Sequence, residues 1–165
     1  MTADAVVVVE DENAQTVVVT PTATTKEDAV TDACVQVAVR IRPLLHREID
    51  EETCVHVVQN QQIQIGGTSG PRFTFDNVFD ENVSQIELYE TRIARLVEYN
   101  LEGYNATILA YGQTGSGKTH TILGNFDNHE RGVIPRALED LFAKLNSEID
   151  VEYSVSIQFL ELYGE

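Results

Sequence analysis

The chain has 165 residues, a length that predicts one domain, and its 42% hydrophobic and 23% charged residues are ordinary for a globular protein. Its formal net charge of −16 argues against nucleic acid or an anionic membrane as a partner of this segment. No apolar run is long enough to cross a bilayer, and no basic N-terminal region precedes an apolar core as in secretory signals. We therefore expect a globular cytoplasmic domain with an acidic surface.

Residues 1–33 differ in composition from the rest of the chain. They are rich in Thr, Val and Ala, they are acidic with Lys26 as their single basic residue, and their apolar side chains gather at Val6–Val9 and Val17–Val19. Segments of low hydrophobicity and high net charge bury too little apolar surface to offset the entropy lost on folding. We predict a disordered leader over residues 1–33, with a short hairpin as the alternative, and a folded part over residues 34–165.

The folded part opens with a strand, because residues 35–41 alternate between apolar and polar side chains. Pro43 cannot donate a hydrogen bond to a neighbouring strand and should end this one. Arg40 and Arg42 share the face opposite the apolar residues. They form either a solvent-exposed strand edge or a recognition surface, in which guanidinium planes and a prolyl ring contact a flat ligand. Spacing alone favours the exposed edge.

A group of short strands and a helix should follow. Residues 53–75 contain three alternating pieces, and the glycine-rich stretch 66–71 predicts a turn between two of them. Ser84-Gln85-Ile86-Glu87 has the pattern of a capping box, and Gly103 suits the end of the helix that it starts. The buried face of this helix is predicted to carry Ile86, Tyr89, Ile93, Leu96 and Val97.

The second half predicts two further strands and two helices. Residues 106–111 form a nearly unbroken apolar run, as expected for a strand buried on both faces. A short helix should open at Lys118 and break near Gly124, and a longer one should start at Pro135. Alternation over residues 151–159 predicts a last strand. The inward residues of the longer helix are predicted to be Leu138, Leu141, Phe142 and Leu145. This order is typical of an α/β fold.

Residues 112–119 match the phosphate-binding pattern G-x-x-x-x-G-K-[ST] without a mismatch. A chance glycine-rich turn is the alternative, but the strand before the loop and the helix after it are the context that the motif requires. Glycines let successive N–H groups turn inward as an anion nest, Lys118 can reach phosphates as a point charge, and the Thr119 hydroxyl can bind Mg²⁺. The predicted phosphate-binding residues are Gly112, Gln113, Thr114, Gly115, Ser116, Gly117, Lys118 and Thr119.

Five segments, in order, resemble the motor domain of kinesins, and the resemblance runs from about Val35 to Glu165. They are the R-x-R-P strand at residues 37–44, the F-x-F-D-x-V-F segment at 73–79, the strand and phosphate loop at 103–119, Gly-Val-Ile-Pro-Arg at 132–136, and Phe-Leu-Glu-Leu-Tyr-Gly-Glu at 159–165. The Gly-Tyr-Asn-Ala-Thr stretch within the third is similar to the kinesin-4, chromokinesin-like subgroup.

The resemblance implies an α/β P-loop NTPase fold of the kinesin motor type, truncated after the strand ending near Tyr163. It implies ATP and Mg²⁺ as cofactors, with Lys118 and Thr119 as catalytic residues and Thr119 as the Mg²⁺ ligand. In kinesins the R-x-R-P segment packs against adenine, which reverses the preference drawn from spacing. Arg40, Arg42 and Pro43 become candidate adenine contacts, with His120 on the other side of the ring. Glu161 follows an apolar stretch and could be interpreted as a Walker-B carboxylate, but the resemblance implies that it is a residue of an ordinary sheet strand.

The chain departs from the family in extent. The two switch segments of kinesins, N-x-x-S-S-R-S-H and D-x-A-G-S-E, do not occur in its 165 residues. In the family's sheet, strands from that later half also lie between strands that are present here. We therefore expect the N-terminal part of an ATP-driven microtubule motor of the cytoskeleton, inactive by itself, which meets microtubules only through other regions of its parent. The alternatives are another P-loop enzyme, such as a small kinase or GTPase, and a non-catalytic fragment or regulator.

Overall fold

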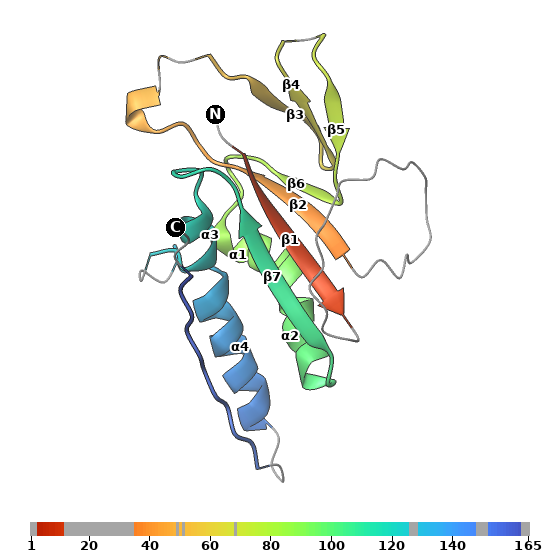
Figure 1. Cartoon of the computed structure of the whole chain (residues 1–165), viewed down its shortest axis with the longest axis vertical. Coiled ribbons are helices and arrows are strands. Elements are labelled where there is room, and N and C mark those ends of the chain that lie inside the picture. Colours follow the sequence, from red (N-terminus) through yellow and green to blue (C-terminus); the bar gives the residue numbers. More distant parts are fainter. Residues whose placement is uncertain are drawn as a thin grey trace.

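Four strands form the larger of two sheets: β1 (Ala3–Asp11), β2 (Val35–Ile41), β6 (Asn77–Phe79) and β7 (Asn105–Tyr111). Their order is β6-β2-β1-β7, as Figure 1 shows. β2 and β6 are parallel, whereas β1 is antiparallel to both of its neighbours. The computed structural model describes residues 3–11, 35–48, 50, 52–67, 69–125, 129–147 and 152–162.

The leader contributes a strand where the sequence predicted disorder. In β1, Val7 lies opposite Val37 of β2 on one side and opposite Leu109 of β7 on the other. The composition argument averaged over 33 residues and gave too little weight to the run Val6–Val9 that it noted. Valine strongly favours strands, and a strand between two edges can pair with both. The rest of the expected leader, residues 1, 2 and 12–33, lies outside the described residues.

A smaller three-stranded sheet packs beside the larger one. It consists of β3 (Val55–Gln59), β4 (Gln62–Ile65) and β5 (Arg72–Thr74), all antiparallel, after a short 3₁₀ helix, η1 (His46–Glu48). The three alternating pieces and the glycine-rich turn between two of them are confirmed. One core cluster joins the two sheets through Val39, Ile41, Val55, Ile63 and Val78.

The first helix has three parts: α1 (Gln85–Leu88), a π-helical turn η2 (Tyr89–Ile93) and α2 (Ala94–Leu101). The predicted cap is confirmed, since the Ser84 hydroxyl accepts a hydrogen bond from Glu87 N at 3.2 Å. Ile86, predicted inward, is exposed, while Leu88 is buried. The wider π turn changes the angle between side chains before and after it, so one 3.6-residue period does not hold across the helix.

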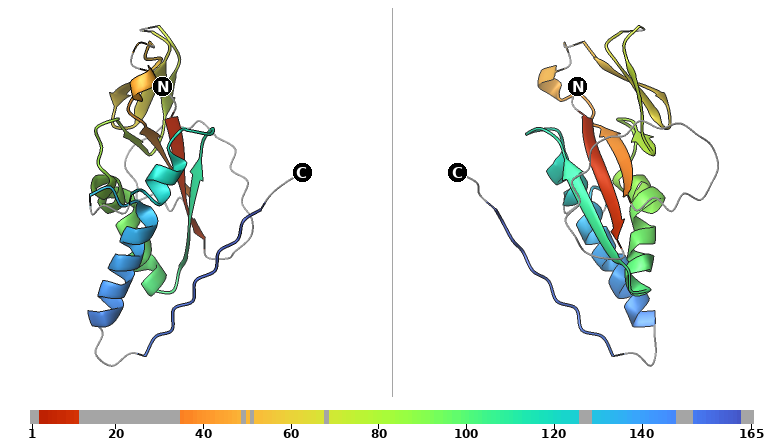
Figure 2. Two further views of the ribbon diagram at one scale, coloured as in Figure 1. Left: turned by 90° about the vertical axis from the view of Figure 1, so that its left-hand side faces the viewer. Right: turned by 45° about the vertical axis from the view of Figure 1, so that its right-hand side comes forward.

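The remaining helices, α3 (Lys118–Ile122) and α4 (Val133–Ser147), follow β7. The short α3 is confirmed, and Gly124 follows it with a φ of 68° and a bridge to Arg131. α4 begins two residues before the predicted Pro135. The helices lie on one face of the larger sheet (Figure 2), where the second core cluster forms from Ala38, Phe79, Leu88, Tyr89, Ile93, Leu96 and Val133.

The face of β7 that points away from the helices is exposed to solvent. The apolar run had predicted a strand buried on both faces, and this prediction is wrong. Leu109 is 51% exposed and Tyr111 is 72% exposed, whereas Ala106 and Ile108 pack against the helices. The predicted last strand is also absent, because residues 152–162 are exposed and run without a strand partner among the described residues (Figure 2). Apolar alternation alone cannot form a strand, which needs a neighbour for its N–H and C=O groups.

Candidate phosphate-binding site

The loop between β7 and α3 has the backbone that its glycines predicted. Gly115 and Gly117 have φ angles of 82° and 122°, in the region that side chains disfavour. The Ser116 side chain is fully buried, and its hydroxyl donates to Gln113 O at 2.7 Å. This internal hydrogen bond fixes the turn of the loop. The positive φ angles therefore fall on two of the three glycines in the loop, where no Cβ is present to disfavour them.

Lys118 and Thr119, the candidate phosphate-binding and Mg²⁺-binding side chains, lie at the start of α3. Lys118 Nζ donates to Gly112 O at 2.7 Å and to Gln113 O at 2.8 Å, so its ammonium group folds back over the loop. Thr119 is exposed, which leaves its hydroxyl open to a ligand. Gly117 precedes α3 as its N-cap and supplies no capping side chain. A cation, an exposed hydroxyl and a glycine-lined backbone fit a Mg²⁺–triphosphate group.

The two arginines among the four candidate adenine contacts have different partners. Arg40 points to the helix side of the sheet, where its Nη1 atom donates to Gln85 Oε1 at 2.7 Å and to Thr121 Oγ1 at 3.1 Å. Arg42 instead forms an ion pair with Glu48 of η1 at 2.9 Å, and it donates to the carbonyl of Pro43. Pro43 itself is exposed. The two arginines therefore contact different elements: Arg40 contacts α3, and Arg42 contacts η1.

His120 lies at the surface beside this network. Its side chain is half exposed, and its Nε2 atom lies 3.8 Å from Glu130 Oε2. Partial burial and the nearby Arg40 guanidinium lower the pKa of His120 below its ordinary value, against the opposing effect of Glu130. The imidazole is therefore mainly neutral at pH 7, which suits a ring that stacks on a base better than one that pairs with a phosphate.

A family model for the kinesin motor domain matches residues 40–165, which include the whole phosphate loop. The chain belongs to the kinesin family. The kinesin-like protein KIF27 of Homo sapiens is 44% identical over 137 residues, which cover 79% of this chain and 10% of that protein. The chromosome-associated kinesin KIF4 of Mus musculus is 41% identical over 139 residues, with 79% and 11% covered.

A solved structure supports the same fold. It is described as a fast kinesin, with implications for ATPase mechanism and interactions with microtubules, and it matches with a TM-score of 0.60 and 32% identity. The match covers 68% of this chain and 33% of that kinesin chain. The predicted α/β fold of the kinesin motor type is thus confirmed. The chain spans about a tenth of the length of the kinesin relatives named above.

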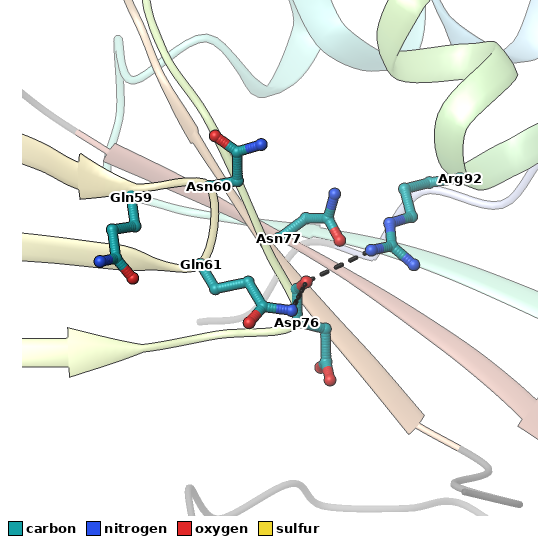
Figure 3. Close-up of a pocket in the computed structure, with 6 residues that line it drawn as sticks. All are labelled: Gln59, Asn60, Gln61, Asp76, Asn77 and Arg92. Carbon is teal, nitrogen blue, oxygen red and sulfur yellow. Dashed lines mark hydrogen bonds between the residues drawn. The ribbon is translucent and has the colours of Figure 1, made fainter. Parts of the chain in front are cut away.

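A polar hollow occurs elsewhere in this kinesin segment, and none of its lining residues belongs to the phosphate loop (Figure 3). The Arg92 guanidinium and the Gln61 amide both donate to Asp76 O there, at 3.2 and 3.3 Å. The lining residues are Gln59, Asn60, Gln61, Asp76, Asn77 and Arg92.

Among the described residues, no helix combines the length and apolarity that crossing a bilayer requires.

Sequence reasoning missed one residue of the site, Gln85. The capping box placed it in the first turn of a helix, where a glutamine is usually solvated. It is buried instead and contacts both Arg40 and the helix that follows the phosphate loop. No local sequence pattern distinguishes it from an exposed glutamine at the same helix position.

Proposed function

We propose that this segment is the ATP-binding part of a kinesin motor, which in its complete parent hydrolyses ATP to move along microtubules in the cytoplasm. The observation that carries the proposal is the complete phosphate loop inside the matched motor region, residues 40–165. The relatives named above and the solved kinesin support it by similarity. The acidic charge of the segment fits a partner surface that lies in other regions of the parent, since tubulin is itself acidic.

Each loop residue has a role in this proposal. Lys118 would neutralise charge on the outer phosphates, and the glycine-lined backbone would donate N–H groups to them. Thr119 would bind Mg²⁺, which when present supplies positive charge to the phosphate oxygens. Phosphoryl transfer depends mostly on positioning and electrostatics, and these residues supply the part that holds the phosphates.

The proposal is tested by titrating the chain with a fluorescent ATP analogue in the presence of Mg²⁺, followed by competition with unlabelled ATP and GTP. We expect saturable binding that ATP reverses more effectively than GTP. Preference for GTP would favour another P-loop enzyme class. Failure to bind either nucleotide would favour a non-catalytic fragment or regulator.

Hydrolysis and microtubule binding are both expected to be absent from the isolated chain. The segments that position water and sense the terminal phosphate in kinesins are not among its residues, so bound ATP would lack its attacking group in position. The measurements are single-turnover phosphate release and cosedimentation with microtubules at physiological salt. Phosphate release above that of a Lys118→Ala variant, or cosedimentation, would contradict this prediction.

Adenine selectivity is expected to depend on Pro43 and His120. Both are exposed, whereas Arg40 and Arg42 already bond to protein groups, so Pro43 and His120 are the better-placed candidates for a base. Replacing both by alanine should weaken ATP by about tenfold, the loss of roughly 1.4 kcal/mol of ring contacts. Inorganic triphosphate, which has no base, should bind as before. Equal weakening of the two ligands would mean that neither residue contacts adenine.

A further inference from the structure

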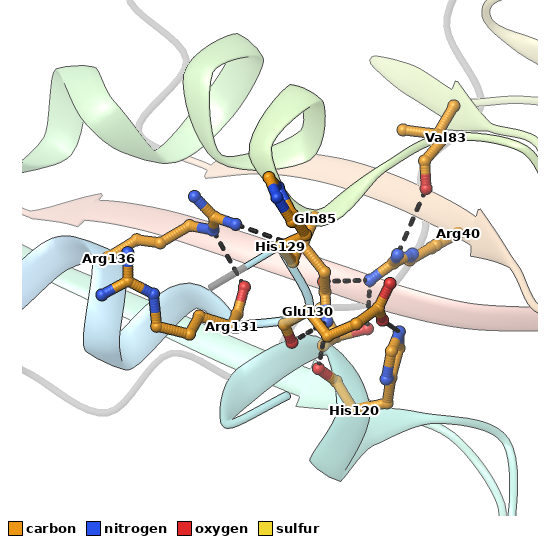
Figure 4. Close-up of polar contacts among 9 residues, drawn as sticks. Arg40, Val83, Gln85, His120, His129, Glu130, Arg131 and Arg136 are labelled. Atoms are coloured by element: carbon orange, nitrogen blue, oxygen red, sulfur yellow. Dashed lines mark hydrogen bonds and ion pairs between the residues drawn. The ribbon is translucent and has the colours of Figure 1, made fainter. Parts of the chain in front are cut away.

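Gln85 connects three separate parts of the chain through one buried side chain. It is 4% exposed at the start of α1, and Figure 4 shows it between Arg40 of β2, His120 of α3 and the segment before α4. Its Oε1 atom accepts from Arg40 Nη1 at 2.7 Å. Its Nε2 atom donates to His120 O at 2.6 Å and to Glu130 O at 3.4 Å.

The bond to His120 O satisfies a carbonyl that α3 leaves open. In a continuing helix, the amide of residue 124 would donate to this carbonyl. Here Leu123 N and Gly124 N both donate to Thr119 O instead, at 2.8 and 3.0 Å, because the helix ends. The last carbonyls of a helix need other donors. The Gln85 amide provides one, and so binds the end of the helix that begins with Lys118.

Arg40 closes the network from the sheet side. The same Nη1 atom that donates to Gln85 also donates to Thr121 Oγ1 at 3.1 Å, and Thr121 is buried. α3 is thus held through a backbone carbonyl by Gln85 and through a side chain by Arg40. Both contacts lie within three residues of Lys118 and Thr119, so a shift of α3 would move the two residues that are proposed to hold the phosphates and Mg²⁺.

We propose that Gln85 is a positioning residue for the phosphate loop: its amide anchors α3 to β2 and to the segment before α4, and thereby sets the positions of Lys118 and Thr119. The inference rests on the proposed nucleotide site. An amide is required because the position needs an acceptor for Arg40 and donors for two carbonyls. A glutamate at this position would still accept from Arg40, but its carboxylate would face the carbonyl oxygens of His120 and Glu130.

The chain contains a matched control, Gln64. It is also a buried glutamine, 7% exposed, and its Nε2 atom also donates to two backbone carbonyls, Gly67 O at 3.0 Å and Gly70 O at 3.3 Å. It belongs to the small sheet, away from the loop-to-helix junction. Gln64→Ala and Gln85→Ala therefore remove similar hydrogen bonds from buried sites, and only the second touches α3.

The experiment compares Gln85→Ala, Gln85→Glu and Gln64→Ala in the full chain. Dissociation constants for ATP and inorganic triphosphate are measured with Mg²⁺, at temperatures where circular dichroism shows each variant to be folded. We expect both Gln85 variants to weaken the two ligands equally, by about tenfold, which corresponds to roughly 1.4 kcal/mol. Gln64→Ala should leave both constants unchanged. Gln85→Met, which keeps the volume, replaces the alanine variant if that one does not fold.

Hydrogen exchange supplies a second measurement that needs no ligand. The amides of residues 121–124 should exchange faster in Gln85→Ala than in the unchanged chain, and not in Gln64→Ala. ATP affinity retained by both Gln85 variants, or lost equally in Gln64→Ala, would overturn the inference. If the unchanged chain binds no nucleotide, the proposed function fails, and unaltered exchange at residues 121–124 in Gln85→Ala would then overturn the anchoring role as well.

Discussion

Replacing Lys118 by alanine is expected to weaken ATP binding by about 10- to 150-fold, because a charge-assisted hydrogen bond contributes roughly 1.5–3 kcal/mol. In the structure the ammonium group bonds to Gly112 O and Gln113 O, which places it over the loop that would hold the phosphates. Inorganic triphosphate should be weakened as strongly as ATP, since the lost contact is to phosphate. The weaker binding of inorganic triphosphate distinguishes Lys118 from Pro43 and His120, whose replacement should weaken ATP alone. The measurement is a titration with a fluorescent ATP analogue.

Lys144 offers the matched control for this prediction. It is also a lysine in a helix, but it pairs with Glu98 and Asp140 at 3.4 and 3.0 Å. Lys144→Ala changes the net charge by the same amount and should leave ATP affinity unaltered. Equal affinities in Lys118→Ala and the unchanged chain would overturn the proposed phosphate site. An equal loss of ATP affinity in Lys118→Ala and Lys144→Ala would mean that the effect comes from the change in net charge and not from a contact of Lys118 with phosphate.

Proline at Val7 is expected to destabilise the larger sheet as a whole. In the part of the chain that the structure describes, β1 lies between β2 and β7, so a break in it separates the strand that carries the phosphate loop from the rest of the sheet. Proline removes an N–H from a strand that pairs on both sides and leaves a carbonyl without its donor, which costs about 1–3 kcal/mol. Since whole domains are stable by only about 5–15 kcal/mol, we expect a clearly lower midpoint of urea unfolding.

Val7→Thr is the control for this second prediction. It keeps the backbone N–H and a β-branched side chain at the same position of β1, so its unfolding midpoint should fall less than that of Val7→Pro. Removal of residues 1–33 should have the largest effect, because two apolar strand edges would then be open and prone to aggregation. A chain of residues 34–165 with a sharp, cooperative unfolding transition would show that β1 is dispensable.

The sequence predicted those elements whose signal is local. β2 has the predicted bounds, because alternation and Pro43 define a strand without reference to its neighbours. α3 is short as expected, because Gly124 ends it. The cap at Ser84 likewise depends on side chains within one helical turn. For the phosphate loop, the residue types and the backbone angles agree because the motif itself specifies the glycines.

The sequence could not predict features that depend on distant partners. The apolar run in β7 does not reveal that one of its faces is left open, and the valines of β1 do not reveal which edges they meet. Residues 152–162 alternate as a strand does, yet they find no partner among the described residues. Gln85 is the clearest case at the candidate site. It is buried among partners that lie far from it in the sequence: Arg40 of β2 and the carbonyls of His120 and Glu130.

The position of β1 has a consequence for synthesis on the ribosome. β1 is made first, but Ala5 of β1 pairs with Tyr111 of β7, which is translated much later. Translation proceeds at about 5–20 residues per second, so the edge of β1 that pairs with β7 remains unpaired for on the order of 10 s. Asp4 on one side of the run and Glu10 and Asp11 on the other are charges of the kind that oppose aggregation of nascent strands. The acidity of this segment would therefore protect the chain during the interval before its sheet can close.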